Sequence, residues 1–213
     1  YWCESIGIDA RNIVTVRQEH DRRVLRVGHE NAGHEAQPGS RSAGTADALI
    51  TDELGIVLMT LHADCLPILI VDPDRPAIAA VHAGWRGTVT NVVGATVHAL
   101  VESYDSRPDR LLAILGPGIG PCCYQVGPEV VAAWRNSVVS DPEQALLEND
   151  QETIFNLWTA NVMLLRHAGL QTDRLESTAT CTRCDSANWF SHRSQGPNTG
   201  RSAALISLRA AST

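Results

Sequence analysis

The sequence predicts an α/β fold in which parallel and antiparallel strands are mixed. Short apolar runs of strand length occur together with amphipathic segments of helix length, but the two kinds do not alternate strictly. The 213 residues are 44% hydrophobic, which is enough for one large domain, or two small ones, with a full core. Because no internal repeat or linker is visible, we expect residues 1–213 to form a single domain.

The first third of the chain predicts strands separated by turns and one long loop. Residues 12–27 are typical of two short strands flanking a polar turn, and 28–45 form a Gly-, Ser-, Ala- and His-rich loop. Residues 46–52 form a short element, and 55–72 supply one or two buried strands. The turn Pro-Asp-Arg-Pro at 73–76 then leads into another strand.

The rest of the chain predicts three helices and three strands. Thr88 is a plausible N-cap for a helix over about 89–104. Pro128 opens a helix through about 135, and Asn156 caps another that stops at Gly169. The strands are 111–116, 176–182 and 201–208, with a Gly/Pro-rich loop at 116–127 and a long polar loop at 184–200.

Composition argues against several classes of protein. A net charge of −7 and a pI of about 5.6 are unlike those of a nucleic-acid binder. The sequence contains no stretch of 18 uninterrupted apolar residues, so we do not expect a membrane span. Six cysteines are few for a disulfide scaffold of this length. We therefore expect a cytoplasmic protein that is a monomer or weak homodimer. Since the chain starts without Met, we also expect that material is missing upstream.

Cys65 and His82 are the most informative pair of residues. They lie in one continuous block, LHADCLPILIVDPDRPAIAAVHAGWRG, whose two apolar runs can pair as antiparallel neighbours. Such pairing would bring a thiolate and an imidazole side by side, and both are common ligands of zinc and copper. His20 is the best candidate for a third ligand. In isolation, Cys65 could equally be a packed core thiol and His82 a core histidine with its hydrogen bonds satisfied.

Polar residues near this pair indicate a cleft. Asp64 interrupts an apolar run, where an unpaired charge is costly to bury. Trp85 offers a stacking surface and Arg86 a forked cation for phosphate or carboxylate, although both also have ordinary structural uses. The loop at 116–127 could present N–H groups to an anion, or could simply be a tight turn.

The remaining cysteines give weaker signals. Cys181-x-x-Cys184 is half of a structural zinc site, but no second C-x-x-C follows or precedes it. Cys122 and Cys123 could supply a ligand or nucleophile near the cleft, or could be packed thiols. These motifs alone do not predict a second metal.

Four blocks resemble the YfiH/laccase-domain family, also described as multicopper polyphenol oxidase-like or purine nucleoside phosphorylase-type. They are ADCLPILIVD, AAVHAGWRG, LGPGIGPCCYQVG and SHR…TGR, and the similarity covers roughly residues 11–208. The chain departs from the family's QVHG at Glu19 and Asp21, has Gln125 where Glu is frequent, and has SHRS for the commoner SHRR. The family's N-terminal Thr-Thr-Arg-x-Gly-Gly signature is absent.

The resemblance implies a layered α/β/β/α arrangement with mixed sheets. It also implies a metal site at His20, Cys65 and His82. Two activities are described for the family: phosphorolysis of purine nucleosides (adenosine, inosine, guanosine and methylthioadenosine) with adenosine deamination, and copper-dependent oxidation of phenols. A multicopper oxidase needs many histidines in His-x-His pairs, whereas this chain has eight histidines and no such pair. We therefore expect one Zn²⁺ with an open position, with Cu²⁺ as the other possible ion.

These expectations assign provisional roles. Cys65, Asp64 and Arg86 are expected to be catalytic, with Asp64 moving protons. Substrate contacts are expected from Trp85, Arg193, Gly118 and Gly120, the glycines through their N–H groups. The substrates would be nucleosides and phosphate, or phenolic compounds if copper is loaded. Metal-free thiol catalysis, with Cys65 as nucleophile and His82 as base, and a non-enzymatic metal-binding module remain the alternatives.

Overall fold

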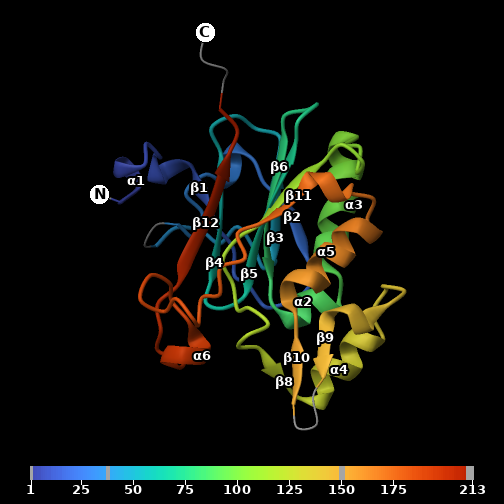
Figure 1. Ribbon diagram of the computed structural model, residues 1–213. Coiled ribbons are helices and arrows are strands. Elements are labelled where there is room, and N and C mark those ends of the chain that lie inside the picture. The colour runs from blue at the N-terminus through green and yellow to red at the C-terminus, as the bar shows by residue number, and fades with distance from the viewer. Residues whose placement is uncertain (1, 37–38, 149–151, 210–213) are drawn as a thin grey trace.

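A mixed six-stranded sheet forms the centre of the molecule in the computed structural model, which describes residues 2–36, 39–148 and 152–209 (Figure 1). Its strand order is β11-β7-β5-β6-β3-β2. The inner pairs are antiparallel, whereas β11 pairs with β7 and β2 with β3 in parallel. The strands are β2 (Val24–Arg26), β3 (Ala48–Thr51), β5 (Leu66–Asp72), β6 (Ala77–Ala83), β7 (Leu112–Leu115) and β11 (Leu175–Ser177).

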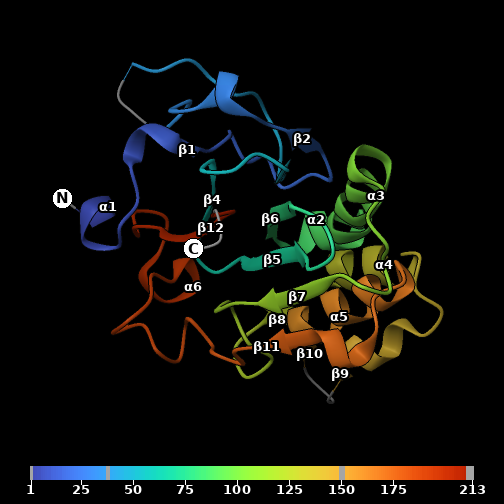
Figure 2. The same cartoon turned by 90° about the horizontal axis from the view of Figure 1, so that it is seen from above.

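Helices cover one face of this sheet (Figure 2). Their apolar side chains share one buried cluster with alternate residues of β6, including Ala79 and Val81. The helices on this side are α2 (Trp85–Val89), α3 (Val92–Tyr104), α4 (Pro128–Arg135) and α5 (Leu157–His167).

A second sheet covers the other face. Its order is β1-β4-β12, and its apolar residues pack against the intervening residues of β6, Ile78 and Ala80. Strand β6 is thus buried on both faces, which explains why its sequence is a continuous apolar run. The strands are β1 (Ile13–Val14), β4 (Val57–His62) and β12 (Ser202–Ser207).

Short elements complete the α/β/β/α layering. Helices α1 (Trp2–Ser5) and α6 (His192–Gln195) lie on the side of the β1-β4-β12 sheet, away from α3 and α5 (Figures 1 and 2). A third sheet, of order β8-β10-β9, lies beside α4. Its strands are β8 (Gln125–Val126), β9 (Leu146–Glu148) and β10 (Thr153–Phe155), and the 3₁₀ turns are η1 (Ala10–Asn12), η2 (His29–Asn31), η3 (Pro142–Ala145) and η4 (Thr172–Arg174).

The predicted hairpin around residues 73–76 is confirmed. Strands β5 and β6 pair antiparallel, with Pro67 opposite His82 and Leu66 opposite Ala83. The helices after Pro128 and Asn156 are also confirmed, and the Asn156 side chain accepts a hydrogen bond from the Thr159 N–H group at 3.1 Å.

The predicted helix over 89–104 is wrong at its start. The chain forms α2, breaks, and begins again as α3 after Asn91, whose side chain accepts the Gly94 N–H group at 3.0 Å. Asn91 has φ 65°, a left-handed conformation that Asn tolerates better than most residues. Thr88 is instead buried inside α2, where its hydroxyl accepts a hydrogen bond from Asn161 at 3.0 Å.

The predicted closing strand over 176–182 is also shorter than expected. Strand β11 ends at Ser177, and the chain then crosses to pair with the loop around Gly118. No helix in the described part of the chain combines the length and the apolar character needed to cross a membrane.

Candidate metal centre and adjoining cavity

The structure brings His20, Cys65 and His82 together. His20 lies in the loop after β1, Cys65 in the turn between β4 and β5, and His82 near the end of β6. One nitrogen of each imidazole and the Cys65 sulfur all lie within 4.8 Å of one another. Two nitrogens and a sulfur are a donor set that zinc prefers, and three protein ligands leave a fourth position free.

Asp47, immediately before β3, holds this centre in place. Its buried carboxylate accepts the N–H groups of His20 at 2.9 Å and Asp21 at 2.8 Å. It also bonds Nδ1 of His82 at 2.8 Å, which leaves Nε2 to face the centre. A carboxylate that orients a ligating histidine in this way is a common partner of protein metal sites.

The Cys65 thiol and the His82 imidazole shift each other's pKa. Burial raises the pKa of Cys65, but hydrogen bonds from His20 and His82 outweigh it and bring the pKa to about 6. Burial lowers the pKa of His82, but its bonds to Asp47 and Cys65 raise that pKa to about 9. Without a metal, the centre therefore holds a thiolate beside a charged imidazole at neutral pH.

Gly84 leaves the room that this centre needs. A Cβ atom on Gly84 would lie 2.8 Å from the Cys65 sulfur and 3.1 Å from a ring carbon of His20. Because these contacts are too close, any larger residue would displace two of the three candidate ligands.

His62 lies next to the centre but is not part of it. Its ring bonds the Cys65 carbonyl oxygen at 3.1 Å and the Thr60 hydroxyl at 2.8 Å. Burial, followed by the charge of His82, lowers the pKa of His62 well below its usual value. A neutral His62 therefore supports the turn that carries Cys65.

The centre opens into a cavity of about 610 Å³, a size typical of small-molecule sites. Three arginines border it: Arg86, Arg193 and Arg201. Two aromatic rings, Trp85 and Tyr124, provide flat surfaces. The other lining residues are Val16, Gln18, His20, Leu61, Ala63, Asp64, Cys65, His82, Gly84, Ile119, Leu157 and His192.

The predicted substrate contacts Trp85 and Arg193, and the predicted catalytic residue Arg86, all line this cavity. The Arg86 guanidinium lies over the Trp85 ring, 4.5 Å from its centroid. Arg193 lies over Tyr124 at 5.4 Å and donates to the Gln125 carbonyl oxygen at 3.2 and 3.3 Å. These contacts orient two of the cations that border the cavity.

Asp64 also lines the cavity, but its contacts differ from those of the predicted proton carrier. One carboxylate oxygen accepts the Thr182 hydroxyl at 2.7 Å, and the other accepts the Arg193 N–H group at 2.8 Å. Both donors belong to the segment between β11 and β12, residues 178–201, which includes α6 and is called the C-terminal loop below. This bonding indicates that Asp64 positions the loop, and we do not keep the proton-transfer role for it.

The predicted anion contacts from Gly118 and Gly120 are not supported. The Gly118 N–H group donates to the Thr180 carbonyl oxygen at 3.1 Å, and that of Gly120 donates to the Cys181 sulfur at 3.2 Å. Neither glycine lines the cavity. Their N–H groups are used to join two loops, so an anion has no access to them.

Sequence reasoning missed Asp47, Tyr124 and Arg201. A charged residue opening the apolar run ALIT was a signal for Asp47, of the kind that singled out Asp64. The other two lie in loops, where periodicity gives no signal. Arg201 comes from the end of the C-terminal loop, and only folding reveals that this end borders the cavity.

Comparison with known proteins places this site in a family. Residues 1–209 match the family model described as "Multi-copper polyphenol oxidoreductase laccase". The chain therefore belongs to this family, which is the YfiH/laccase-domain family that the motifs resemble.

Two curated relatives carry different enzyme names. The chain is 32% identical to purine nucleoside phosphorylase YlmD of Geobacillus stearothermophilus, over 97% of this chain and 76% of the relative. It is also 32% identical to adenosine deaminase RL5 of an unknown prokaryotic organism, over 92% of this chain and 75% of the relative.

Solved structures agree with the fold. The hypothetical protein YfiH of Bacillus licheniformis superposes with a TM-score of 0.94 at 30% identity, over 98% of this chain and 78% of the other. The YlmD structure from Geobacillus stearothermophilus gives 0.91 at 31% identity, with the same coverage.

Proposed function

We propose that this chain is a zinc-dependent purine nucleoside phosphorylase that also deaminates adenosine. One observation carries the proposal: a two-histidine, one-cysteine group opens into a ligand-sized cavity bordered by arginines and aromatic rings. The cations suit phosphate, the rings suit a purine, and the donor set suits zinc. The names of the two curated relatives support both activities.

In phosphorolysis, a phosphate oxygen bonds to the anomeric carbon of the ribose while the bond from that carbon to the purine breaks. Arg86 and Arg193 bind the phosphate through paired N–H donors and stabilise its charge. Trp85 and Tyr124 stack on the purine and orient the bond that breaks. The departing purine takes up a proton, and His192, whose imidazole borders the cavity, is placed to supply it.

His20, Cys65 and His82 would hold the zinc ion, and Asp47 keeps His82 in the tautomer that binds it. When bound, zinc acts as a Lewis acid and lowers the pKa of a coordinated water to about 7. In deamination, water replaces the amino group at C6 of adenosine and ammonia leaves. The same aromatic walls would hold the base in this reaction.

Copper-dependent phenol oxidation is the second candidate function. The family description favours it, and a two-histidine, one-cysteine set also resembles a copper–thiolate site. However, within residues 2–36, 39–148 and 152–209, only this one metal-sized group contains histidine. The described part of the chain therefore offers no further histidine group for the other ions of a multicopper centre.

Incubation of the purified chain with adenosine, with and without phosphate, tests the proposal. We expect adenine and ribose 1-phosphate to form only with phosphate present, and inosine to form without it. Hypoxanthine should appear from inosine when phosphate is present. A protein that converts no nucleoside, but takes up oxygen with a phenol in proportion to bound copper, would contradict the proposal.

A parallel measurement addresses metal-free thiol chemistry. If zinc binds Cys65, added zinc should slow the alkylation of this residue, whereas a free nucleophile would react at the same rate with or without zinc.

A further inference from the structure

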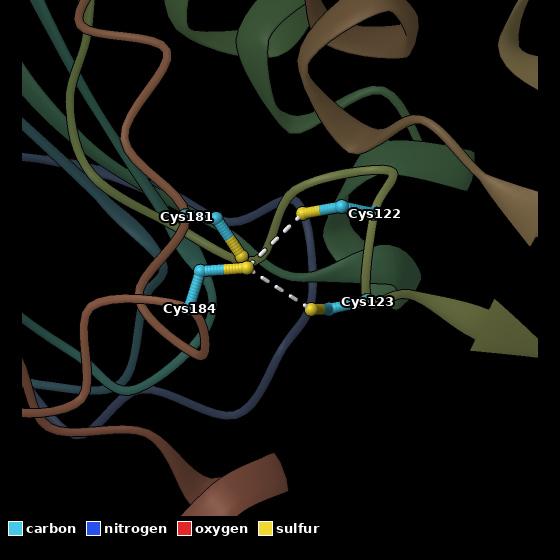
Figure 3. A group of neighbouring side chains, drawn as sticks. All are labelled: Cys122, Cys123, Cys181 and Cys184. Carbon is cyan, nitrogen blue, oxygen red and sulfur yellow. Dashed lines mark hydrogen bonds between the residues drawn. The ribbon is translucent and has the colours of Figure 1, made fainter.

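Four cysteines converge on one point outside the cavity (Figure 3). Cys122 and Cys123 come from the loop between β7 and β8, and Cys181 and Cys184 come from the segment after β11. All four sulfur atoms lie within 4.8 Å of one another. The Cys184 sulfur is 3.4 Å from those of Cys122 and Cys123, and all four cysteines are free thiols.

Backbone hydrogen bonds hold these two segments together. The Gly118 N–H group donates to the Thr180 carbonyl oxygen, and the Thr182 N–H group donates to the Gly118 carbonyl oxygen, both at 3.1 Å. Tight turns then aim the side chains inward, because Cys123 N–H donates to Gly120 O and Asp185 N–H to Cys181 O. These backbone bonds place the two pairs of cysteines next to each other.

The spacing fits a single small ion. Four thiolates around zinc, each at about 2.3 Å, stand about 3.8 Å apart in a tetrahedron. The observed sulfurs need to move only slightly to reach that arrangement. An iron–sulfur cubane would need them farther apart, because each cysteine binds a different iron.

A hydrogen bond to sulfur also favours a thiolate here. The Gly120 N–H group donates to the Cys181 sulfur at 3.2 Å, and Cys181 is buried. Such N–H donors stabilise negative charge on a ligating sulfur. Among the described residues, this group contains no histidine or carboxylate, so all four donor atoms are sulfur, a soft ligand that zinc accepts.

We propose that Cys122, Cys123, Cys181 and Cys184 bind one Zn²⁺ ion as a closed structural site. Four protein ligands leave no position for water or substrate, so the ion has no catalytic role. Binding replaces the thiol protons by the metal and releases them to solvent. The proposal does not depend on the function proposed above, because it uses none of the cavity residues.

The site would fix the start of the C-terminal loop that borders the cavity. Thr182 lies between the two C-terminal cysteines and donates its hydroxyl to Asp64, which also accepts the Arg193 N–H group. Zinc at the four cysteines would therefore restrain Thr182 and, through Asp64, the segment that carries Arg193. It would join two loops that are far apart in the sequence.

Zinc content of the full chain, purified under reducing conditions and dialysed against trace zinc, tests the proposal. We expect about two zinc ions per wild-type chain and about one in Cys184→Ser. The Cys65→Ala variant should also retain about one, because it loses only the His/Cys centre. Cys3→Ser is the matched control, since Cys3 lies in α1 and belongs to neither group, and it should keep both ions.

Two further measurements identify the site and do not require that the Cys184→Ser variant folds. In Cys65→Ala, Co²⁺ in place of zinc should give the strong near-ultraviolet absorption of a four-thiolate complex. Titration of this variant with a mercurial reagent should release one zinc as about four thiols react. A metal-free Cys65→Ala protein, with the four thiols either open to alkylation or joined as disulfides, would overturn the proposal whatever the enzyme's activity.

Discussion

At the scale of single residues, one buried carboxylate organises the centre. Asp47 accepts hydrogen bonds from the backbone N–H groups of Glu19, His20 and Asp21. It is also hydrogen-bonded to Nδ1 of His82. It fixes two candidate ligands at once without binding metal itself. A candidate metal ligand can be predicted from its residue type. Asp47, by contrast, acts by binding backbone N–H groups of a distant loop, and no sequence spacing indicates that contact.

Asp47→Asn should therefore weaken zinc binding at the His/Cys centre about 10- to 100-fold, as loss of a histidine-orienting partner typically does. An amide has one acceptor oxygen and a competing NH₂ group, so it cannot satisfy all these donors. Competition with a chromophoric chelator, performed in the Cys184→Ser background, measures the affinity.

Asp52→Asn is the control, because Asp52 is partly exposed, its carboxylate forms a long ion pair with Arg26 at 3.5 Å, and it belongs to neither metal-sized group. It should bind zinc like its parent. Equal affinity of a folded Asp47→Asn protein and this control would show that Asp47 does not orient the ligands.

At the scale of elements, the C-terminal loop depends on the Thr182–Asp64 bond. Thr182→Val removes the donor while keeping the shape, so a buried carboxylate oxygen loses its partner. We expect the free energy of unfolding, measured by urea denaturation, to fall by about 1–3 kcal/mol. The KM for phosphate should rise as well, because Asp64 also holds the Arg193 backbone.

Thr182→Ser separates the hydrogen bond from packing. It keeps the hydroxyl and loses one methyl group, so its unfolding free energy should fall by no more than about 1 kcal/mol and its KM should stay near the wild-type value. The account of this bond fails if the serine and valine variants behave alike.

The break between α2 and α3 depends on Asn91. Asn91→Ala loses the hydrogen bond to the Gly94 N–H group. It also places alanine, which has a Cβ atom but no polar side chain, in the left-handed conformation at φ 65°. We expect a loss of about 1–2 kcal/mol in unfolding free energy. Asn91→Gly adopts this conformation freely and should lose only a few tenths. Equal destabilisation by alanine and glycine would contradict this explanation.

Prediction of elements succeeded where one local pattern decides the outcome. Apolar runs, the Pro128 start and the Asn156 cap each identified an element, because nearby residues determine these features. The break at Asn91 was missed because Thr88 is an equally good N-cap by residue type, and only its burial against Asn161 excludes it. The division of β4 and β5 between two sheets likewise depends on distant partners.

At the scale of the whole molecule, the two sheets place the centre. The β5–β6 hairpin belongs to the six-stranded sheet, and β1, which precedes His20, belongs to the three-stranded one. His20 therefore reaches Cys65 and His82 only because the three-stranded sheet packs against the face of the six-stranded sheet that includes Ile78 and Ala80 of β6. The two residues of the hairpin could be paired from sequence, whereas His20 was chosen by residue type and family resemblance.

The whole-molecule arrangement also explains the missed four-cysteine group. Cys181-x-x-Cys184 offered two ligands, and its partners are adjacent residues of another loop, which sequence spacing does not associate with a C-x-x-C motif. Pairing of Gly118 with Cys181 brings them together. Contacts between loops, unlike the elements themselves, are determined only in the folded chain.

Phosphate-dependent release of adenine from adenosine by wild type, Cys65→Ala and Cys3→Ala tests the central claim most directly. Wild type and Cys3→Ala should turn over alike, whereas Cys65→Ala should remain folded, lose the zinc of the His/Cys centre and slow at least about 100-fold, because the ligand set is reduced to two histidines. Full phosphate-dependent turnover by a folded Cys65→Ala protein from which all metal has been removed would contradict the account.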